Sequence, residues 1–187
     1  MWGIPWSGYN TEVGMAQTQP VPFSHKHHVS GLGLDCRYCH TSVETSANAG
    51  IPPVETCMTC HSQIWTNAAM LEPVRRAFTD GAPLRWNRVN YLPDYVYFNH
   101  SIHVAKGVAC TTCHGPVGDM PLMWRGRSLY MSWCLDCHRN PAPNLRPREA
   151  VFSTDWKPSG GTPSGEARLR AYHVHPATLS DCSVCHR

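Results

Sequence analysis

The chain has 187 residues, a formal net charge of +3, and no run of about 18 apolar residues that could serve as a membrane span. Leu, Ile, Val and Phe total 33 residues, below the roughly 20% at which core-forming side chains become scarce. Pro and Gly total 30 and disfavour long regular elements. The charge is too low to keep the chain unfolded, and no lysine-rich stripe supports binding of nucleic acid. A compact protein of this composition needs core material beyond its own side chains.

All ten cysteines fall in five copies of Cys-x-x-Cys-His, the attachment motif of c-type haem. Two thiols bind the porphyrin covalently, and the adjacent histidine is the proximal iron ligand. Zinc ribbons pair two such units per metal, and a redox dithiol needs no adjacent histidine. The cysteines are Cys36, Cys39, Cys57, Cys60, Cys110, Cys113, Cys134, Cys137, Cys182 and Cys185, followed by His40, His61, His114, His138 and His186. The sequence predicts a mostly irregular, loop-rich fold of short helices packed around five covalently attached haems.

Residues 1–22 form a lead segment without a basic or apolar leader pattern. Because haem is attached outside the cytoplasm, we expect an export signal or membrane anchor upstream of Met1. Trp2, Trp6 and Tyr9 fit either an interfacial aromatic belt after such an anchor or packing at a domain edge.

Two di-haem modules follow, at residues 23–61 and 98–140, each opening on Phe-x-His-x-x-His. The connector, residues 62–97, has apolar residues at helical spacing, and a helix end is expected at Asp80-Gly81. Pro73 makes one unbroken helix through this spacing doubtful. Residues 141–170 form a Pro/Gly-rich linker with little regular structure expected, and residues 171–187 form the fifth haem site.

The histidines outside the motifs are candidate distal ligands, since electron-transfer haems take a second axial histidine or methionine. We expect four of them to ligate iron. In each Phe-x-His-x-x-His copy, one histidine would serve the haem that follows it and the other a neighbouring haem. These are His25, His28, His100 and His103. For the fifth haem, one candidate distal ligand is His175, seven residues before the motif, with His173 nearby. The other candidate is a methionine such as Met131, with Met120 and Met123 near it in the sequence. His27, absent from the second module, is expected to be solvated or paired with a propionate.

Arginine supplies 13 of the 16 basic residues, and its fork-shaped guanidinium suits pairing with haem propionates. Candidate distal ligands outnumber the haems, so an open iron position for a substrate is not expected. The sequence therefore predicts an electron carrier without a catalytic site of its own. A multihaem enzyme is the less favoured alternative.

Four phrases carry a closer resemblance. They are Phe23-Ser-His-Lys-His-His28, Ala49-Gly-Ile-Pro-Pro53, Leu92-Pro-Asp-Tyr-Val-Tyr-Phe-Asn-His100 and Met131-Ser-Trp-Cys-Leu-Asp-Cys-His-Arg139. They resemble the pentahaem cytochrome c subunit of alternative complex III, and similar phrases occur in class III cytochromes c of membrane molybdopterin-type oxidoreductases. The resemblance covers residues 20–140 well and the last fifty residues more loosely.

The resemblance implies a haem wire in a membrane quinol:acceptor oxidoreductase at the periplasmic face of the cytoplasmic membrane. The implied partners are an iron–sulfur/molybdopterin-like subunit, polytopic quinone-binding subunits, and a monohaem cytochrome c or soluble carrier. The family's N-terminal transmembrane helix is not found here, so membrane association is expected through the complex or through a helix missing from this sequence. The alternative is a soluble periplasmic pentahaem shuttle that donates electrons to a separate reductase.

Overall fold

The computed structural model describes residues 8–186, and its regular elements are short. The longest α-helix among these residues, α7, has 9 residues. The α-helices are α1 (Gly8–Thr11), α2 (Cys36–Cys39), α3 (Val54–His61), α4 (Glu72–Thr79), α5 (His100–Ala105), α6 (Cys110–His114), α7 (Met131–Arg139), α8 (Gly165–Ala171) and α9 (Cys182–Cys185). A π-helical turn, η2 (Lys26–Gly31), and five 3₁₀ turns complete the set: η3 (Ala69–Leu71), η4 (Val117–Asp119), η5 (Ala142–Asn144), η6 (Arg148–Ala150) and η7 (Pro176–Thr178). Within residues 8–186 there is no strand, only isolated bridges, and no helix long and apolar enough to cross a bilayer. The expected loop-rich fold with short helices is confirmed.

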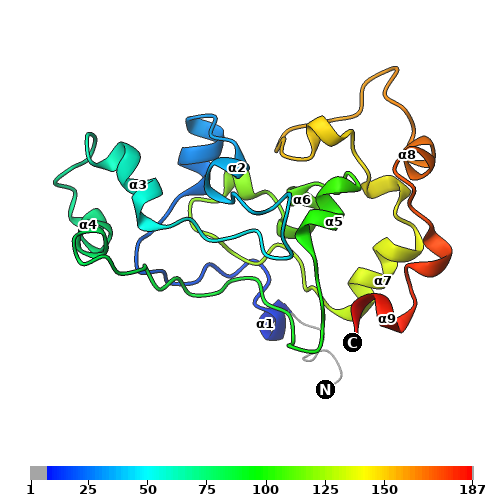
Figure 1. The fold of residues 1–187 in the computed structure, drawn as a ribbon, viewed down its shortest axis with the longest axis horizontal. Coiled ribbons are helices and arrows are strands. Elements are labelled where there is room, and N and C mark those ends of the chain that lie inside the picture. Colours follow the sequence, from blue (N-terminus) through cyan, green and yellow to red (C-terminus); the bar gives the residue numbers. More distant parts are fainter. Residues whose placement is uncertain (1–7, 187) are drawn as a thin grey trace.

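Each Cys-x-x-Cys-His motif lies on or at the end of a helix, namely α2, α3, α6, α7 or α9. Cysteines three residues apart share one face of a helix, so both thiols of a motif point to the same side. Figure 1 shows the motif helices spread along the long axis of the molecule, with α3 towards one end and α7 and α9 towards the other. This spread sets the distribution of the candidate haem sites.

The connector carries the helix that its spacing predicts. The turn η3 leads into α4, where Pro73 occupies the first turn, a position that needs no backbone N–H donor. Asp80 is the C-terminal cap, and Gly81 follows with a φ of +61°. The predicted end at Asp80-Gly81 is confirmed. The doubt about one unbroken helix is confirmed as well, because α4 begins only at Glu72, next to Pro73.

The largest apolar cluster joins α4 to α3. Its buried members are Val21, Val54, Leu71, Val74 and Ala77. The cluster also contacts Cys57 and Met58 on the cysteine-bearing face of α3. Elsewhere, only Met120 and Val151 are large side chains with essentially no exposed surface within residues 8–186. The side chains therefore form little core of their own, as the composition predicts.

Large apolar side chains remain exposed beside the motifs. Examples are Tyr38 in the first motif, Ile102 on α5 and Val184 in the fifth motif. Such bare apolar surface is costly in water unless something covers it. A flat apolar macrocycle attached at each motif would cover it.

The lead segment ties distant parts of the chain together. Val13 and Ala16 form bridges with Arg125 and Trp124, and Gln19 exchanges two 2.9 Å hydrogen bonds with the backbone of Asn87. Trp2 and Trp6 lie outside the described residues, so the two roles considered for them stay open.

The linker after the second module is mostly irregular, with the 3₁₀ turns η5 and η6 in its first part. Its last residues, however, form α8, which was not anticipated. Ser164 caps this helix by accepting a 3.2 Å hydrogen bond from Ala167 N–H, and α8 packs against η5.

Candidate haem sites

The two Phe-x-His-x-x-His copies have nearly the same side-chain geometry. In each, the Phe ring stacks on the second histidine and meets the first histidine edge-on. The stacked centroids are 4.4 Å apart at 23° in the first copy and 4.5 Å apart at 26° in the second. The edge-on pairs lie at 5.0 Å and 4.8 Å. The residues are Phe23, His25 and His28, and then Phe98, His100 and His103.

The second histidine of each copy has a fixed ring orientation. Nδ1 of His28 donates to the carbonyl of Ser24 at 2.8 Å, and Nδ1 of His103 donates to that of Asn99 at 2.7 Å. A ring that donates from Nδ1 presents a lone pair at Nε2, the nitrogen that can bind a metal. Both histidines are thus set up as Nε2 ligands.

The same bond orients most of the histidines in the motifs. Each of four donates from Nδ1 to a backbone carbonyl: His40 to Gly50 at 2.7 Å, His61 to Ile64 at 3.3 Å, His138 to Leu179 at 2.9 Å, and His186 to Tyr95 at 3.1 Å. His100 donates likewise to Ala47 at 2.8 Å. In His25 and His114 the buried Nδ1 has no partner.

Three histidines of the Phe-x-His-x-x-His copies face a motif histidine at nearly the same separation. The ring centroids are 6.3 Å apart for His28 and His61, 6.3 Å for His100 and His114, and 6.2 Å for His103 and His138. Two metal–imidazole bonds of about 2 Å, plus about 1 Å from each nitrogen to its ring centre, give about 6 Å. The spacing fits one iron between each pair of rings.

The remaining pair involves the first motif. Burial, followed by the proximity of His40 and His28, lowers the pKa of His25 to about 4. Burial and three neighbouring imidazoles lower the pKa of His114 to about 4 in the same way. These rings are neutral at physiological pH, as an iron ligand must be. The sequence analysis expects one distal histidine of each copy to serve the haem that follows it, and His25 lies near His40, the motif histidine of that haem.

The fifth motif has different surroundings. Its α9 docks on the segment before α5, where Tyr97 N–H donates to the Cys185 carbonyl at 2.8 Å. The Tyr95 ring lies 5.9 Å from that of His186. His175 and Met131 are exposed, and within residues 8–186 no ring contact joins His186 to another histidine. The tyrosine contact was missed in the sequence because it links residues 91 positions apart.

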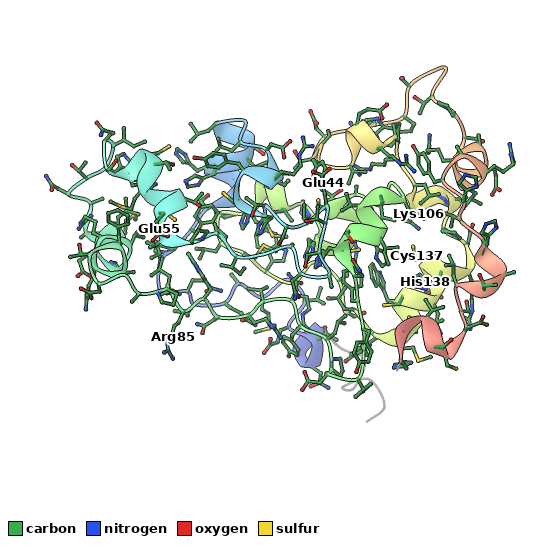
Figure 2. The ribbon with its side chains drawn as sticks, in the orientation of Figure 1. Glu44, Glu55, Arg85, Lys106, Cys137 and His138 are labelled. Atoms are coloured by element: carbon green, nitrogen blue, oxygen red, sulfur yellow. The ribbon has the colours of Figure 1, made fainter. Side chains whose placement is uncertain are left out.

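None of the ten cysteines forms a disulfide. Burial, with Cys137 and Cys134 nearby, raises the pKa of Cys113 to about 12. The adjacent Cys110 thiol lowers the pKa of Cys36 to about 7. Figure 2 shows Cys137 and His138 together on α7.

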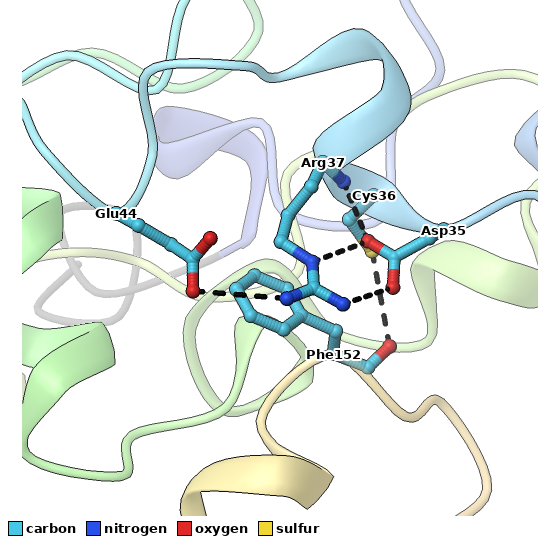
Figure 3. A network of polar contacts seen from close by, with 5 residues as sticks. All are labelled: Asp35, Cys36, Arg37, Glu44 and Phe152. Carbon is cyan, nitrogen blue, oxygen red and sulfur yellow. Dashed lines mark hydrogen bonds and ion pairs between the residues drawn. The ribbon is translucent and has the colours of Figure 1, made fainter.

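The arginines divide into two groups. Arg37, inside the first motif, forms a fork with Asp35 at 2.8 and 2.9 Å and lies over the Phe152 ring (Figure 3). By contrast, Arg125 is 5% exposed, pairs with no carboxylate among the described residues, and leaves Nη2 buried without a partner. Its Nε and Nη1 donate to the carbonyls of Val89 and Thr11, and its guanidinium lies 4.1 Å from the centroid of the Tyr91 ring, so Nη2 is the nitrogen that an anion could still satisfy.

Two further arginines line a cavity of about 750 Å³ beside α7. Its walls include Arg127 and Arg146, together with Trp133, Trp156 and Cys137. Cationic and aromatic walls next to an attachment cysteine suit a flat apolar ring that carries carboxylates. The cavity thus fits a haem of the fourth motif.

His27 has a contact that its sequence position did not reveal. Its ring stacks on that of Trp65 at 5.9 Å and 17°, and Trp65 also lies 6.4 Å from His61. The expectation of a solvated side chain is met in part, since His27 is exposed.

Comparison with known proteins agrees with this geometry. Residues 8–83 match the class III cytochrome c family. This part of the chain is similar to class III cytochromes c. Such proteins carry covalently attached c-type haem.

The chain is also similar to the menaquinone reductase multihaem cytochrome c subunit of Nitratidesulfovibrio vulgaris. The two are 32% identical over 110 residues, which cover 58% of this chain and 51% of the relative. The chain thus spans about half the length of that relative.

Proposed function

We propose that this chain is a five-haem electron-transfer subunit of a membrane quinone-linked oxidoreductase. The main support is the duplicated arrangement in which histidines of the Phe-x-His-x-x-His copies face motif histidines at 6.2–6.3 Å. A protein with two axial histidines per iron has no free iron position for a substrate, which favours electron transfer over catalysis.

The proposed ligand assignment follows the three facing ring pairs, and by analogy between the two modules it pairs His25, which lies near His40, with the first haem. Each first histidine joins the first haem of its module, and each second histidine joins the second haem. The pairs are His25 with His40, His28 with His61, His100 with His114, and His103 with His138. For the fifth haem, His186 is the proposed proximal ligand, and His175 and Met131 stay the candidate distal ligands.

The chain's own residues prepare these sites. Backbone carbonyls fix the rings through Nδ1, and burial keeps His25 and His114 neutral. Bound haem supplies a one-electron couple at each site. We further propose Arg125 as a propionate partner, because its buried Nη2 has no other anion among the described residues.

The proposed assembly resembles alternative complex III and works at the periplasmic face of the membrane. Electrons would reach the chain from an iron–sulfur/molybdopterin-like subunit served by polytopic quinone-binding subunits, and leave to a monohaem cytochrome c or soluble carrier. The relative in a menaquinone reductase supports a quinone-linked role. A soluble periplasmic shuttle is the second candidate, favoured by the lack of a membrane-spanning helix in residues 8–186.

A native gel of gently solubilised membranes, stained for haem and analysed by mass spectrometry, separates the two candidates. The proposed subunit migrates with iron–sulfur/molybdopterin-like and polytopic membrane proteins. A haem band of this chain alone in the soluble fraction would support the shuttle and contradict the membrane complex.

A further inference from the structure

We propose that the five motifs form a single line whose spatial order differs from their order in the sequence: second, first, third, fourth, fifth. Here the first to fifth motifs are residues 36–40, 57–61, 110–114, 134–138 and 182–186. The inference rests on the proposed function, because it requires a haem at each motif. It adds that electrons enter and leave at the second and fifth motifs.

The second and first motifs touch directly. Tyr38, between the cysteines of the first motif, shares a 2.9 Å hydrogen bond with Thr59, between the cysteines of the second. Their proposed distal ligands, His25 and His28, also stand three residues apart on one turn of chain. Because the two motifs touch through Tyr38 and Thr59, and their proposed distal ligands lie on one turn of the chain, the haems of the first and second motifs would be neighbours.

The first and third motifs meet at one short segment of the linker. The Cys36 thiol lies 3.8 Å from the carbonyl of Phe152, and Cys110 N–H donates to the carbonyl of Val151 at 3.4 Å. The Cys110 thiol is also the main cause of the low pKa of Cys36. The attachment cysteines Cys36 and Cys110 thus lie close together at residues 151–152, although they are 74 positions apart in the sequence.

A second contact strengthens this junction from the distal side. His100 N–H and Nδ1 both bond to the carbonyl of Ala47, at 3.1 and 2.8 Å. Ala47 lies in the loop that follows the first motif, and His100 is the proposed distal ligand of the third. The two modules are therefore joined through their first haems.

The third and fourth motifs share α5, which presents His100 to one and His103 to the other. The cavity of about 750 Å³ is lined by Thr111 of the third motif and Cys137 of the fourth. Arg146 spans the same wall and donates to the Thr111 hydroxyl at 3.0 Å. These contacts place the fourth motif next after the third.

The fourth and fifth motifs are joined through the proximal histidine of the fourth. Nδ1 of His138 donates at 2.9 Å to the carbonyl of Leu179, three residues before Cys182. Burial and the nearby Cys185 raise the pKa of the Cys134 thiol. The fifth motif therefore follows the fourth.

The contacts above make the second and fifth motifs the two ends of the proposed line, and Figure 1 shows α9 beside α7. Figure 1 shows α3 and α9 far apart along the long axis, with α2 and α6 between them. At the α3 end, the 59% exposed Trp65 lies against the His61 ring. An end position at the surface suits electron exchange with another protein.

The test is the position of the five irons in the haem-loaded chain, from anomalous diffraction at the iron edge. The expected result places the first-motif iron between the irons of the second and third motifs, and the fourth-motif iron between those of the third and fifth. A second-motif iron nearest to any but the first, or a fifth-motif iron nearest to the third, overturns the order. Fewer than five irons would contradict the proposed function, whereas five irons in another order contradict only the line.

A matched pair of variants tests the same order in solution. His28→Met and His103→Met each place a thioether methyl on one known iron, which marks that haem in the NMR spectrum of the reduced protein. The haem marked by His28→Met should show Overhauser contacts to one other haem, and the haem marked by His103→Met to two. Contacts to two haems from the His28→Met site, or to one from the His103→Met site, overturn the proposal.

Discussion

Replacing His28 by alanine should open one iron to carbon monoxide, whereas replacing its neighbour His27 should not. The His28 ring faces His61 at 6.3 Å, a spacing that fits a shared iron. The His27 ring stacks instead on Trp65 and faces no proximal histidine among the described residues. Adjacent residues of one type thus have opposite expected effects.

The size of the effect follows from these contacts. His28→Ala removes one axial ligand, so the reduced protein should bind about one more carbon monoxide per chain than the parent. It also removes the stack on Phe23, worth about 0.5–1.5 kcal/mol, and the bond to the Ser24 carbonyl, worth about 1 kcal/mol. His27→Ala removes one exposed stack, so a smaller loss of stability and no gain in ligand binding are expected.

Carbon monoxide titration of the dithionite-reduced proteins, followed in the Soret region, measures the difference. Both variants should retain the parent's haem content, which shows that each has folded and been loaded. An increase in His27→Ala without one in His28→Ala would refute the ligand assignment. Equal binding in His28→Ala and the parent would refute it as well.

Three further outcomes are expected. An added Cβ at Gly126 would clash with the His114 carbonyl oxygen and lie 2.6 Å from the His114 carbonyl carbon and 2.7 Å from the Gly115 nitrogen. Gly126→Ala should therefore cost about 1–3 kcal/mol in thermal unfolding, whereas Gly160→Ala, with open space, should cost much less. Equal losses would contradict this. Arg125→Gln should lower the reduction potential of one haem by tens of millivolts, where 59 mV is about a tenfold change in a one-electron equilibrium. Arg125→Lys should lower it by less. An unchanged redox titration would argue against Arg125 as a propionate partner. Asp35→Ala should lose about 1 kcal/mol of helix capping, and Asp35→Asn should lose less. Because Arg37 lowers the pKa of Asp35, the wild type should be more stable than Asp35→Asn at neutral pH, and this advantage should fade as the pH drops below about 4. Melting curves with a constant difference down to pH 2 would contradict it.

The sequence could predict features that depend on local pattern. The apolar spacing with Asp80-Gly81 predicted the end of α4. The scarcity of core-forming residues predicted a loop-rich fold with few buried side chains. The similarity of residues 8–83 to class III cytochromes c agrees with the broader resemblance found in the sequence, while alternative complex III remains a proposal.

Features that depend on distant contacts could not be predicted. The helix α8 forms in a Pro/Gly-rich stretch because Ser164 caps it and Gly165 lies against the backbone of Ala142. The contact of Tyr95 with His186 depends on where α9 docks. The order of the motifs likewise depends on where Val151 and Phe152 lie, which no local pattern reveals.

The most direct test of the central claim is the number of haems covalently bound to each chain. The pyridine haemochrome absorbance per mole of protein gives this number, and the intact mass under denaturing conditions, with a thiol titration, checks it. The account predicts about five haems per chain and no free thiol. A smaller number, or free thiols at any motif in the fully matured protein, would contradict it.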